Sequence, residues 1–240
     1  MKPTKDLLIK RAERIDLFIK LLLYCVGTLV LPPIMSVTFA QTVTAVDGNI
    51  YYSPSSGTDR RQITTTGLDS QPGLSPDGST VVFVRRTPGR TVQTAYPDTE
   101  ATELWTVRID GSNARLRVRG KASKTIEETV AGIQIPEFSA DGRGIYFLSA
   151  GWVTSSAVHV LNLNTGRVRF VCPGNSLEVV RKGQYRGHLI VTQHRYFIGG
   201  GSYDWSWLVT PDGRQVGPIG QGENAEFEER LKYARGEKLR

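Results

Sequence analysis

The sequence predicts an all-β fold: a small β-propeller of about four blades, one of them incomplete, followed by a short C-terminal helix. Two observations lead to this fold class. Short runs rich in β-branched and aromatic residues alternate with Gly, Pro, Asn and Asp along residues 41–222, a spacing typical of sandwiches, barrels and propellers. Within this region one pattern occurs twice, and repetition of a four-strand unit favours a propeller.

The first copy of the pattern occupies residues 71–118 and the second occupies residues 135–171. Each copy contains a Pro, a Ser, a turn that ends in Asp-Gly, a strand, and then a hairpin. Asp-Gly suits a tight β-turn because Gly has no Cβ and Asp tolerates the left-handed region. Residues 48–64 resemble the second half of a blade, and residues 187–220 resemble a further blade with altered connections and a third Pro-Asp-Gly turn.

We interpret the repeated turns as structural, with Asp and Ser side chains capping backbone groups. A catalytic pairing of Asp77 with Asp141 is the alternative. Equivalent positions in successive blades, however, lie on a ring and not across one substrate. The residues predicted to form structural turns are Ser75, Pro76, Asp77, Gly78, Ser139, Asp141, Gly142, Asp212 and Gly213.

One copy of the repeat resembles a known family. Residues 72–83, PGLSPDGSTVVF, followed by LWTV and then Asp110-Gly111, look like the repeat of the TolB C-terminal propeller, which also occurs in propeller domains of the prolyl oligopeptidase family. The resemblance covers most of residues 42–219 and is strong in two repeats. It implies a protein-binding role in the bacterial cell envelope. TolB itself has six blades and a separate N-terminal α/β domain, and this chain accommodates neither in full.

The first 40 residues predict an export signal. A basic stretch leads into LLLYCVGTLVL, which is short for a spanning helix of about 20 residues. The small residues Thr38 and Ala40 predict cleavage after Ala40, which would release a periplasmic protein with no lasting membrane insertion. An uncleaved anchor that includes Leu17–Met35 and leaves the chain facing the periplasm from the inner membrane is the alternative. Cys172 is then the one cysteine left, and we interpret it as a small apolar residue and not as a reactive thiol.

The remaining residue patterns predict no catalytic residue, no cofactor and no metal site. Gly-x-Ser-x-Gly, the nucleophile motif of α/β-hydrolases, is absent from the sequence, and GGGSYD has Asp204 in place of its last Gly. The histidines His159, His188 and His194 lack the spacing of a helical ligand pair. Net charge is +7, partly from the first 40 residues, and no long basic run predicts nucleic-acid binding.

Two segments are candidate partner-binding surfaces. Arg115, Arg117 and Arg119 alternate along one strand, so we expect them to share a face that docks an acidic partner or an anionic polymer, or that blocks edge-to-edge pairing. The second segment is a glycine-rich loop among aromatic residues, at a blade end where ligand contacts are common. Its candidate residues are Gly199, Gly200, Gly201, Tyr203 and Asp204.

The sequence therefore predicts a signal peptide (1–40), a TolB-like propeller (41–222) and a C-terminal helix with a tail (223–240). The predicted function is a non-enzymatic module that binds another envelope protein. The alternative is a propeller that binds an envelope glycan, and a divergent hydrolase-associated propeller is the third hypothesis. The insertions at 87–102 and 120–131 are natural places for contacts. We expect a compact monomer whose ring closes when QTVTAV pairs with the last blade, and an open fragment that dimerises is the alternative.

Overall fold

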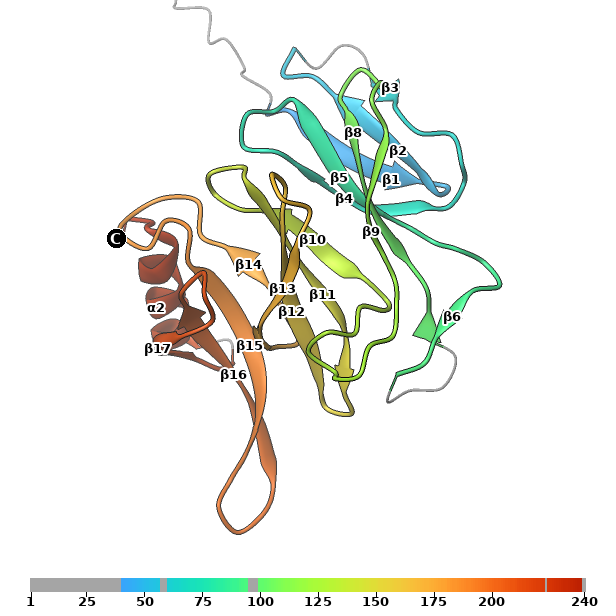
Figure 1. Cartoon of the computed structure of the whole chain (residues 1–240). Coiled ribbons are helices and arrows are strands. Elements are labelled where there is room, and N and C mark those ends of the chain that lie inside the picture. Colours follow the sequence, from blue (N-terminus) through green and yellow to red (C-terminus); the bar gives the residue numbers. More distant parts are fainter. Residues whose placement is uncertain (1–39, 57–59, 95–98, 223, 239–240) are drawn as a thin grey trace, which may run out of the picture. The chain divides into compact units, whose positions relative to one another are not determined.

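The computed structural model describes residues 40–238 except 57–59, 95–98 and 223 (Figure 1). The predicted signal peptide lies outside the described residues apart from Ala40. Strands dominate this part of the chain, and they are grouped into successive antiparallel sheets. The all-β class is therefore confirmed. No helix of the described residues has the length and apolar character that a membrane span requires.

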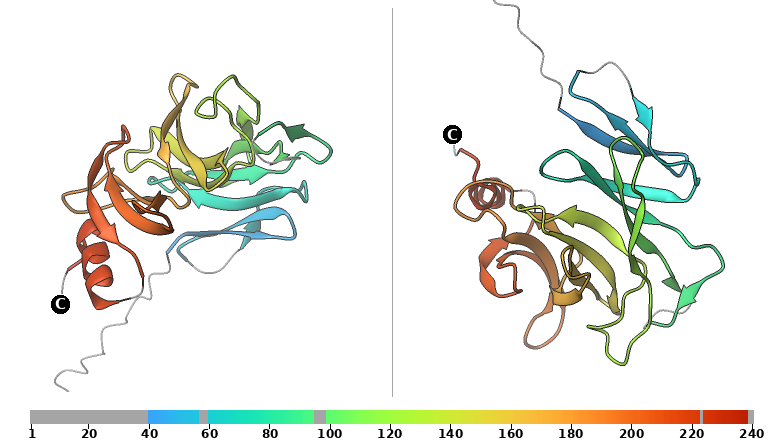
Figure 2. Two further views of the ribbon diagram at one scale, coloured as in Figure 1. Left: turned by 90° about the horizontal axis from the view of Figure 1, so that it is seen from below. Right: turned by 45° about the horizontal axis from the view of Figure 1, so that its top comes forward.

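Four sheets follow one another in chain order (Figures 1 and 2). The first has three strands, β1 (Thr42–Val46), β2 (Asn49–Ser53) and β3 (Arg61–Gln62). Each of the others has four strands that pair with their neighbours in sequence. The second contains β4 (Asp69–Leu74), β5 (Thr80–Arg85), β8 (Glu103–Arg108) and β9 (Arg115–Arg119).

The third and fourth sheets repeat this plan. The third contains β10 (Gln134–Phe138), β11 (Gly144–Trp152), β12 (Ser155–Asn162) and β13 (Val168–Pro173). The fourth contains β14 (Glu178–Val179), β15 (Leu189–Tyr196), β16 (Ser202–Val209) and β17 (Gln215–Gly220). A small separate hairpin, β6 (Thr91–Val92) with β7 (Thr99–Glu100), forms in the insertion at 87–102.

The first strands of successive sheets are neighbours: β1 contacts β4, β4 contacts β10, and β10 contacts β14. This is the arrangement of propeller blades, whose first strands line the axis. One sheet with three strands and three sheets with four strands confirm a repeat of about four blades with one incomplete.

The expected closure of the ring by QTVTAV is wrong. Residues of QTVTAV form β1, which pairs with β2 and so completes the first sheet instead of the last one. Among the described strands, β17 pairs with β16, and no pairing joins the fourth sheet to the first. The hairpin turn at Asp47 and Gly48 explains the outcome, because both residues adopt positive φ and fold β2 directly back onto β1.

Apolar clusters fill the spaces between neighbouring sheets. Ile50 and Phe83 belong to the cluster between the first two sheets, and Leu104 and Phe147 belong to the next one. Val158 and Leu189 belong to the cluster between the third and fourth sheets. The second and third sheets therefore have a neighbouring sheet on both faces, whereas the first and fourth sheets each have one on a single face.

The outward face of the first sheet is largely polar. Thr44 lies opposite Tyr51 in the β1–β2 register, and the guanidinium of Arg60 covers the Tyr51 ring at 4.1 Å. A polar outer face is the usual property of a terminal repeat in a stacked array. Val46, which is 39% exposed, is an apolar residue on the same face.

The outward face of the fourth sheet is covered by α2 (Ala225–Arg235). Phe227 and Leu231 pack against the buried residues Ile190, Leu208 and Ile219, as their spacing of four predicts. Asn224 caps the helix, because its side chain accepts a hydrogen bond from the backbone N–H of Phe227. Arg235 also holds the helix to β14 through two hydrogen bonds of 2.7 Å to the Glu178 carboxylate.

Candidate binding surfaces

The repeated Ser-x-Asp-Gly turns connect the first and second strands of the second and third sheets. Ser75 donates a hydrogen bond of 2.5 Å to Asp77, and its oxygen accepts one of 2.9 Å from the backbone N–H of Thr80. In the third sheet Ser139 donates to Asp141 at 2.6 Å and accepts from the backbone of Gly144 at 2.8 Å. These hydrogen bonds from Ser lower the pKa of both Asp side chains, so each carboxylate is ionised and already satisfied.

The turn at Asp212-Gly213 occupies a different place in its blade. It connects β16 to β17, and Thr210 donates to the Asp212 carboxylate within it. It therefore corresponds to the turns at Asp110-Gly111 and Thr165-Gly166 in the two preceding sheets. Gly213 is required there, since a Cβ at this position would lie 2.1 Å from the carbonyl oxygen of Val171.

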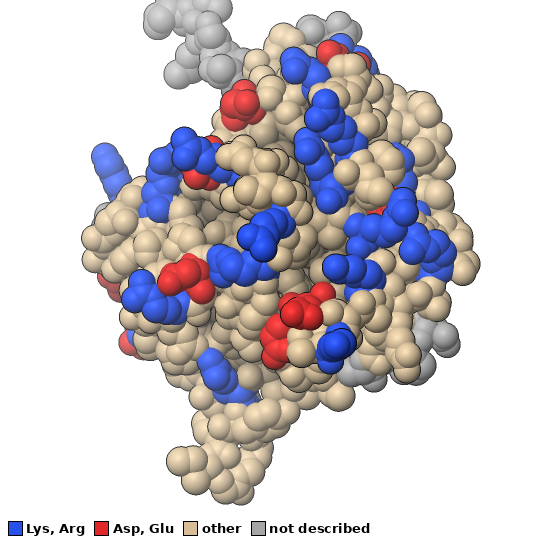
Figure 3. Space-filling model, in the orientation of Figure 1, with Lys and Arg blue, Asp and Glu red and all other residues tan. Residues whose placement is uncertain are grey.

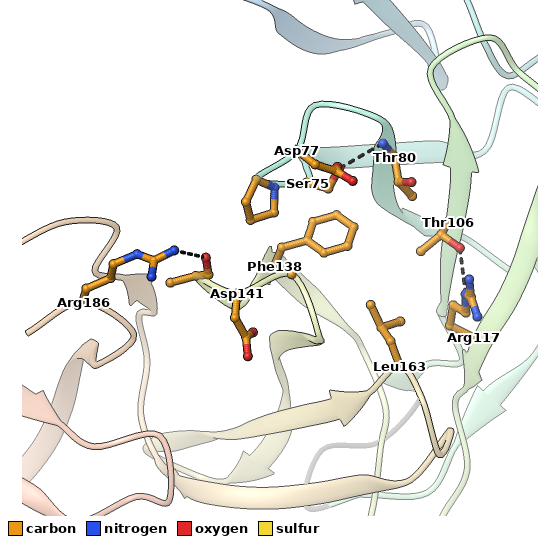
Figure 4. Close-up of a pocket in the computed structure, with 12 residues that line it drawn as sticks. Ser75, Asp77, Thr80, Thr106, Arg117, Phe138, Asp141, Leu163 and Arg186 are labelled. Carbon is orange, nitrogen blue, oxygen red and sulfur yellow. Dashed lines mark hydrogen bonds between the residues drawn. The ribbon is translucent and has the colours of Figure 1, made fainter.

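A pocket of about 480 Å³ opens between the turn ends of the second and third sheets (Figure 4). Its floor is apolar, with Phe138 and Leu163, and its rim is polar. Arg117 donates from Nε to Thr106 Oγ1 at 2.7 Å, and Arg186 reaches in from the fourth sheet to donate to the carbonyl of Ala140 at 2.9 Å. The pocket therefore offers guanidinium donors to a ligand, while its two carboxylates, from Asp77 and Asp141, are held by their own turns.

The expectation that Arg115, Arg117 and Arg119 share one face is wrong. Arg115 lies opposite Thr106, whereas Arg119 lies opposite Glu103, and the register between β8 and β9 shifts in between. Positions 103 and 106 of β8 lie on opposite faces, because β8 pairs regularly with β5 and side chains alternate along a strand.

The shift is a β-bulge, and it separates the three arginines. Arg117 remains on the Thr106 side, where it lines the pocket, and desolvation followed by the nearby Arg115 charge lowers its pKa. Arg119 turns to the other side and forms an ion pair of 3.0 Å with the buried carboxylate of Glu103. Arg119 is therefore a structural partner of the second sheet.

A larger groove of about 1210 Å³ continues from the pocket, and Asp141 lines both. One wall is the end of β9 with the insertion at 120–131, and the other is formed by the turns and outer strands of the third sheet. Lys121, Arg143 and Arg167 line it, and within the described residues their charged side-chain groups form no hydrogen bond or ion pair, although Arg143 and Arg167 donate from their backbone N–H groups. Figure 3 shows Lys and Arg side chains on both sides of a hollow in this face, with acidic side chains grouped at one end.

His159 fixes the insertion that forms one wall of this groove. Its Nε2 lies 2.8 Å from the carbonyl oxygen of Glu127 and its Nδ1 lies 3.2 Å from Ser149 Oγ. Burial lowers the pKa of His159, so the neutral ring donates from Nε2 to the carbonyl and accepts from Ser149. Within the described ranges, no three His, Cys, Asp or Glu side chains are grouped as metal ligands.

The candidate glycine-rich loop is the tip of a long hairpin between β15 and β16, which projects from the fourth sheet (Figure 1). Gly199, Gly200 and Gly201 all have positive φ, which an L-residue rarely adopts. Tyr203 is half-buried, with its ring 4.5 Å from Phe197 and 5.7 Å from Trp205. Asp204 lies across the hairpin from His194, and the two side chains are 3.0 Å apart.

Exposed apolar residues surround this tip; the sequence predicted aromatic residues around the loop, but the candidate binding residues did not include these. Tyr196 is 66% exposed, Phe197 is 58% exposed and Ile198 is fully exposed. Val153, at the tip of the adjacent β11–β12 hairpin, is also exposed, and Thr154 there lies within 3.1 Å of the Tyr196 hydroxyl. The available signal was an apolar run directly before three glycines, which places large side chains at a turn instead of in a core.

Cys172 is buried in β13, in the cluster between the third and fourth sheets. Burial raises the pKa of its thiol to about 11. The reactive species of a cysteine is the thiolate, so this side chain has the environment of an inert core residue.

No protein-family model matches the sequence, and the curated proteins yield no match to it. Solved structures with a similar arrangement include dipeptidyl peptidase 4 of Porphyromonas gingivalis, with 12% identity over 77% of this chain and 32% of that one and a TM-score of 0.49. A putative TolB of Agrobacterium tumefaciens has 17% identity over 71% and 55% of the two chains and a TM-score of 0.48. The β-propeller domain of the Trilobed protease of Pyrococcus furiosus has 14% identity over 74% and 49%, also with a TM-score of 0.48. The chain thus matches between about a third and just over half of the length of these structures. TolB and a protease propeller, the two groups that the repeat resembles, are both among them.

Proposed function

We propose that the protein is a non-enzymatic interaction module of the bacterial cell envelope, exported to the periplasm by its first 40 residues. Its partner is another envelope protein, which places a segment in the groove between the second and third sheets. The observation that carries this proposal is the set of cations in that groove, Lys121, Arg143 and Arg167, whose charged side-chain groups form no hydrogen bond or ion pair with another described residue.

The mixed lining of the groove favours a peptide segment over a uniform polyanion. Cationic side chains line its walls, while Glu127 and Glu128 from the insertion at 120–131 also face it. Val118 and Phe170 add apolar surface. A peptide can present acidic, basic and apolar side chains in turn, whereas an anionic polymer would be repelled by the two glutamates.

The form of the groove also supports this proposal. Its volume of about 1210 Å³ exceeds that of an ordinary small-molecule site. One wall is a loop that the buried His159 holds at Glu127, and the other is formed by the third sheet. Variable loops on a rigid scaffold are where binding residues are commonly found.

Charge reversal in the groove tests the proposal. The variant R143E/R167E should lose a partner that the wild-type protein captures from native envelope extract. Lys232→Glu on the exposed surface of α2 is the matched control, and it should capture the partner as the wild type does. Capture should also weaken as salt is raised, because exposed charges are screened. Equal capture by R143E/R167E and by the control would contradict the proposal.

Glycan binding is a second candidate, and the adjacent rings of Phe197, Tyr203 and Trp205 favour it. Aromatic faces are common contact surfaces for amphipathic ligands. A glycan array with the wild-type protein and Tyr203→Ala separates this candidate from the first one. If the wild type binds an envelope glycan, and if this binding is lost in Tyr203→Ala and retained in R143E/R167E, the glycan hypothesis is favoured.

A further inference from the structure

The β15–β16 hairpin ends in a segment without charge. From Tyr196 to Tyr203 the sequence is YFIGGGSY, and the first charged residues on the two arms are Arg195 and Asp204. Arg195 pairs with Tyr203 across the hairpin, and His194 pairs with Asp204 one step further from the tip. The tip therefore has a sharp boundary between an uncharged end and a charged base.

Residue types change in order along the hairpin. The extreme end carries Phe197 and Ile198, and the level behind it carries Tyr196 opposite Ser202. Tyr203 follows, and then Trp205, two residues closer to the sheet. This order, with aliphatic and Phe side chains at the end and Tyr and Trp behind them, is typical of segments at a membrane–water interface.

We propose that this tip enters the surface layer of a lipid bilayer, with Phe197 and Ile198 among the acyl chains and Arg195 at the level of the headgroups. Ile198 follows Arg195 by three residue steps, which at strand spacing is about 10 Å. Amphipathic elements that lie in a membrane interface reach a depth of roughly 5–10 Å. The uncharged end thus matches the depth of shallow insertion.

The distribution of exposed side chains around the tip favours lipid over a pocket in a protein. Tyr196 projects from one face of the hairpin, while Phe197 contacts Tyr203 on the other face. A pocket would need apolar groups on the contacting face alone, whereas lipid surrounds the tip on all sides. Val153 on the neighbouring hairpin adds a second apolar side chain near Tyr196.

The backbone of the tip allows shallow entry. The N–H of Phe197 donates to the carbonyl of Gly201 at 3.1 Å, and the N–H of Gly200 donates to the carbonyl of Phe197 at 3.3 Å. The remaining amides of the turn need water or headgroup oxygens, since backbone groups in hydrocarbon must be paired. Insertion therefore stops in the interfacial layer, and binding is reversible, as for other single small anchors.

A fluorophore attached at position 198 tests this proposal in the full chain. Cys25→Ser removes the other labelling site, and Cys172 stays unlabelled because it is buried with a pKa raised to about 11. The protein carrying I198C is mixed with vesicles of phosphatidylethanolamine and phosphatidylglycerol that contain brominated acyl chains. V216C, at an exposed position on β17, is the matched control.

We expect bromine quenching of the label at position 198 and none at position 216. Changing Phe197 to Ser in the labelled protein should weaken the quenched complex by about ten-fold or more, because one large apolar side chain no longer enters the lipid. The readout concerns the tip alone, so binding of residues 1–40 to the vesicles would not imitate it. Absence of quenching at position 198 on vesicle-bound protein, or equal quenching at both positions, would overturn the proposal.

This inference is independent of the groove. R143E/R167E should retain quenching at position 198, and the Phe197→Ser variant should retain capture of the groove partner. Loss of both properties in either variant would show that the two surfaces act as one site and would overturn their assignment to separate ligands.

Discussion

Asp69 and Arg85 form a two-bond ion pair across the β4–β5 register, with Arg85 Nε 2.6 Å from Oδ1 and its terminal nitrogen 2.9 Å from Oδ2 of Asp69. The Asp69 side chain has no exposed surface. The guanidinium also lies 4.4 Å from the ring centre of Trp105. A buried carboxylate thus depends on one arginine, which an aromatic ring holds in place.

Removing one partner of this pair should destabilise the fold strongly. Asp69→Ala leaves the Arg85 charge with no counter-charge in a mostly buried position, and such changes cost about 3–5 kcal/mol of unfolding free energy. Urea unfolding followed by circular dichroism measures the loss. Arg86→Ala is the control, because its ion pair with Glu100 is exposed and should contribute about 1 kcal/mol or less. Similar midpoints for the two variants would contradict the assignment of Asp69.

The repeated turns should contribute to stability in equal measure. Asp77→Ala and Asp141→Ala each remove hydrogen bonds to a Ser and to the backbone, so each should lower the free energy of unfolding by about 1 kcal/mol. Partner capture should be unchanged, because both carboxylates are held within their turns. A change in capture without a change in melting temperature would show that a carboxylate contacts the ligand.

The same turns give a dependence of stability on acid pH. Hydrogen bonds lower the pKa of both carboxyls in the folded state. Their contribution is therefore present above the unfolded-state pKa near 4, and it is lost as the pH falls through the lower folded-state pKa. In the double variant Asp77→Ala/Asp141→Ala, the acid end of the stability profile should be flatter than in the wild type.

His159 should make stability fall between neutral and mildly acidic pH. Burial lowers its pKa, so the unfolded chain takes up a proton before the folded chain does. Stability from the neutral ring is complete above the unfolded-state pKa near 6.5 and declines as the pH falls below it. Urea midpoints measured from pH 7.5 to 5.5 should decline less in His159→Gln than in the wild type. The difference between the two proteins should develop as the pH falls through the unfolded-state pKa of about 6.5.

His194→Gln serves as the comparison for His159, because His194 lies beside the exposed carboxylate of Asp204. It should retain the decline seen in the wild type. If the urea midpoint of the wild type does not change between pH 7.5 and 5.5, the neutral form of His159 does not stabilise the insertion at 120–131.

Tyr203→Ala should affect the hairpin and leave the sheets intact. Tyr203 contacts Phe197 and Trp205, which lie in the projecting part of the hairpin and not in the clusters between sheets. The melting temperature should therefore change little, while quenching of a label at position 198 should decrease. Unfolding of Tyr203→Ala at room temperature would show that the ring belongs to the core.

The parts of the fold that the sequence predicted are those decided by neighbouring residues. Ser75 and Asp77 form their turn through contacts within six residues, so the repeat is visible in the sequence. The partner of β1 was not predictable in this way, because any unpaired strand can accept a β-like segment. The groove was missed since its walls come from Lys121 on one side and from Arg143 and Arg167 on the other. Nothing in their spacing indicates that the three lie around one hollow.

Alternation along a strand also fails where the ladder is irregular. The sequence places Arg117 and Arg119 on one face, and the register shift between β8 and β9 separates them. A bulge depends on how two strands fit together, so the strand sequence alone does not reveal it. The two residues therefore form a natural pair for a test of the candidate surface.

Arg117→Ala and Arg119→Ala should have different effects. Arg117 lines the pocket that continues into the groove, so its removal should weaken capture of the partner and change the melting temperature little. Arg119 points to the other face and pairs with Glu103, whose side chain is 8% exposed. Its removal should leave capture unchanged and lower the free energy of unfolding by about 1 kcal/mol, since Glu103 retains contacts with Arg90 and Trp105. If the two changes weaken capture equally, Arg117 and Arg119 act on the same face of the strand, which would contradict the register of β9.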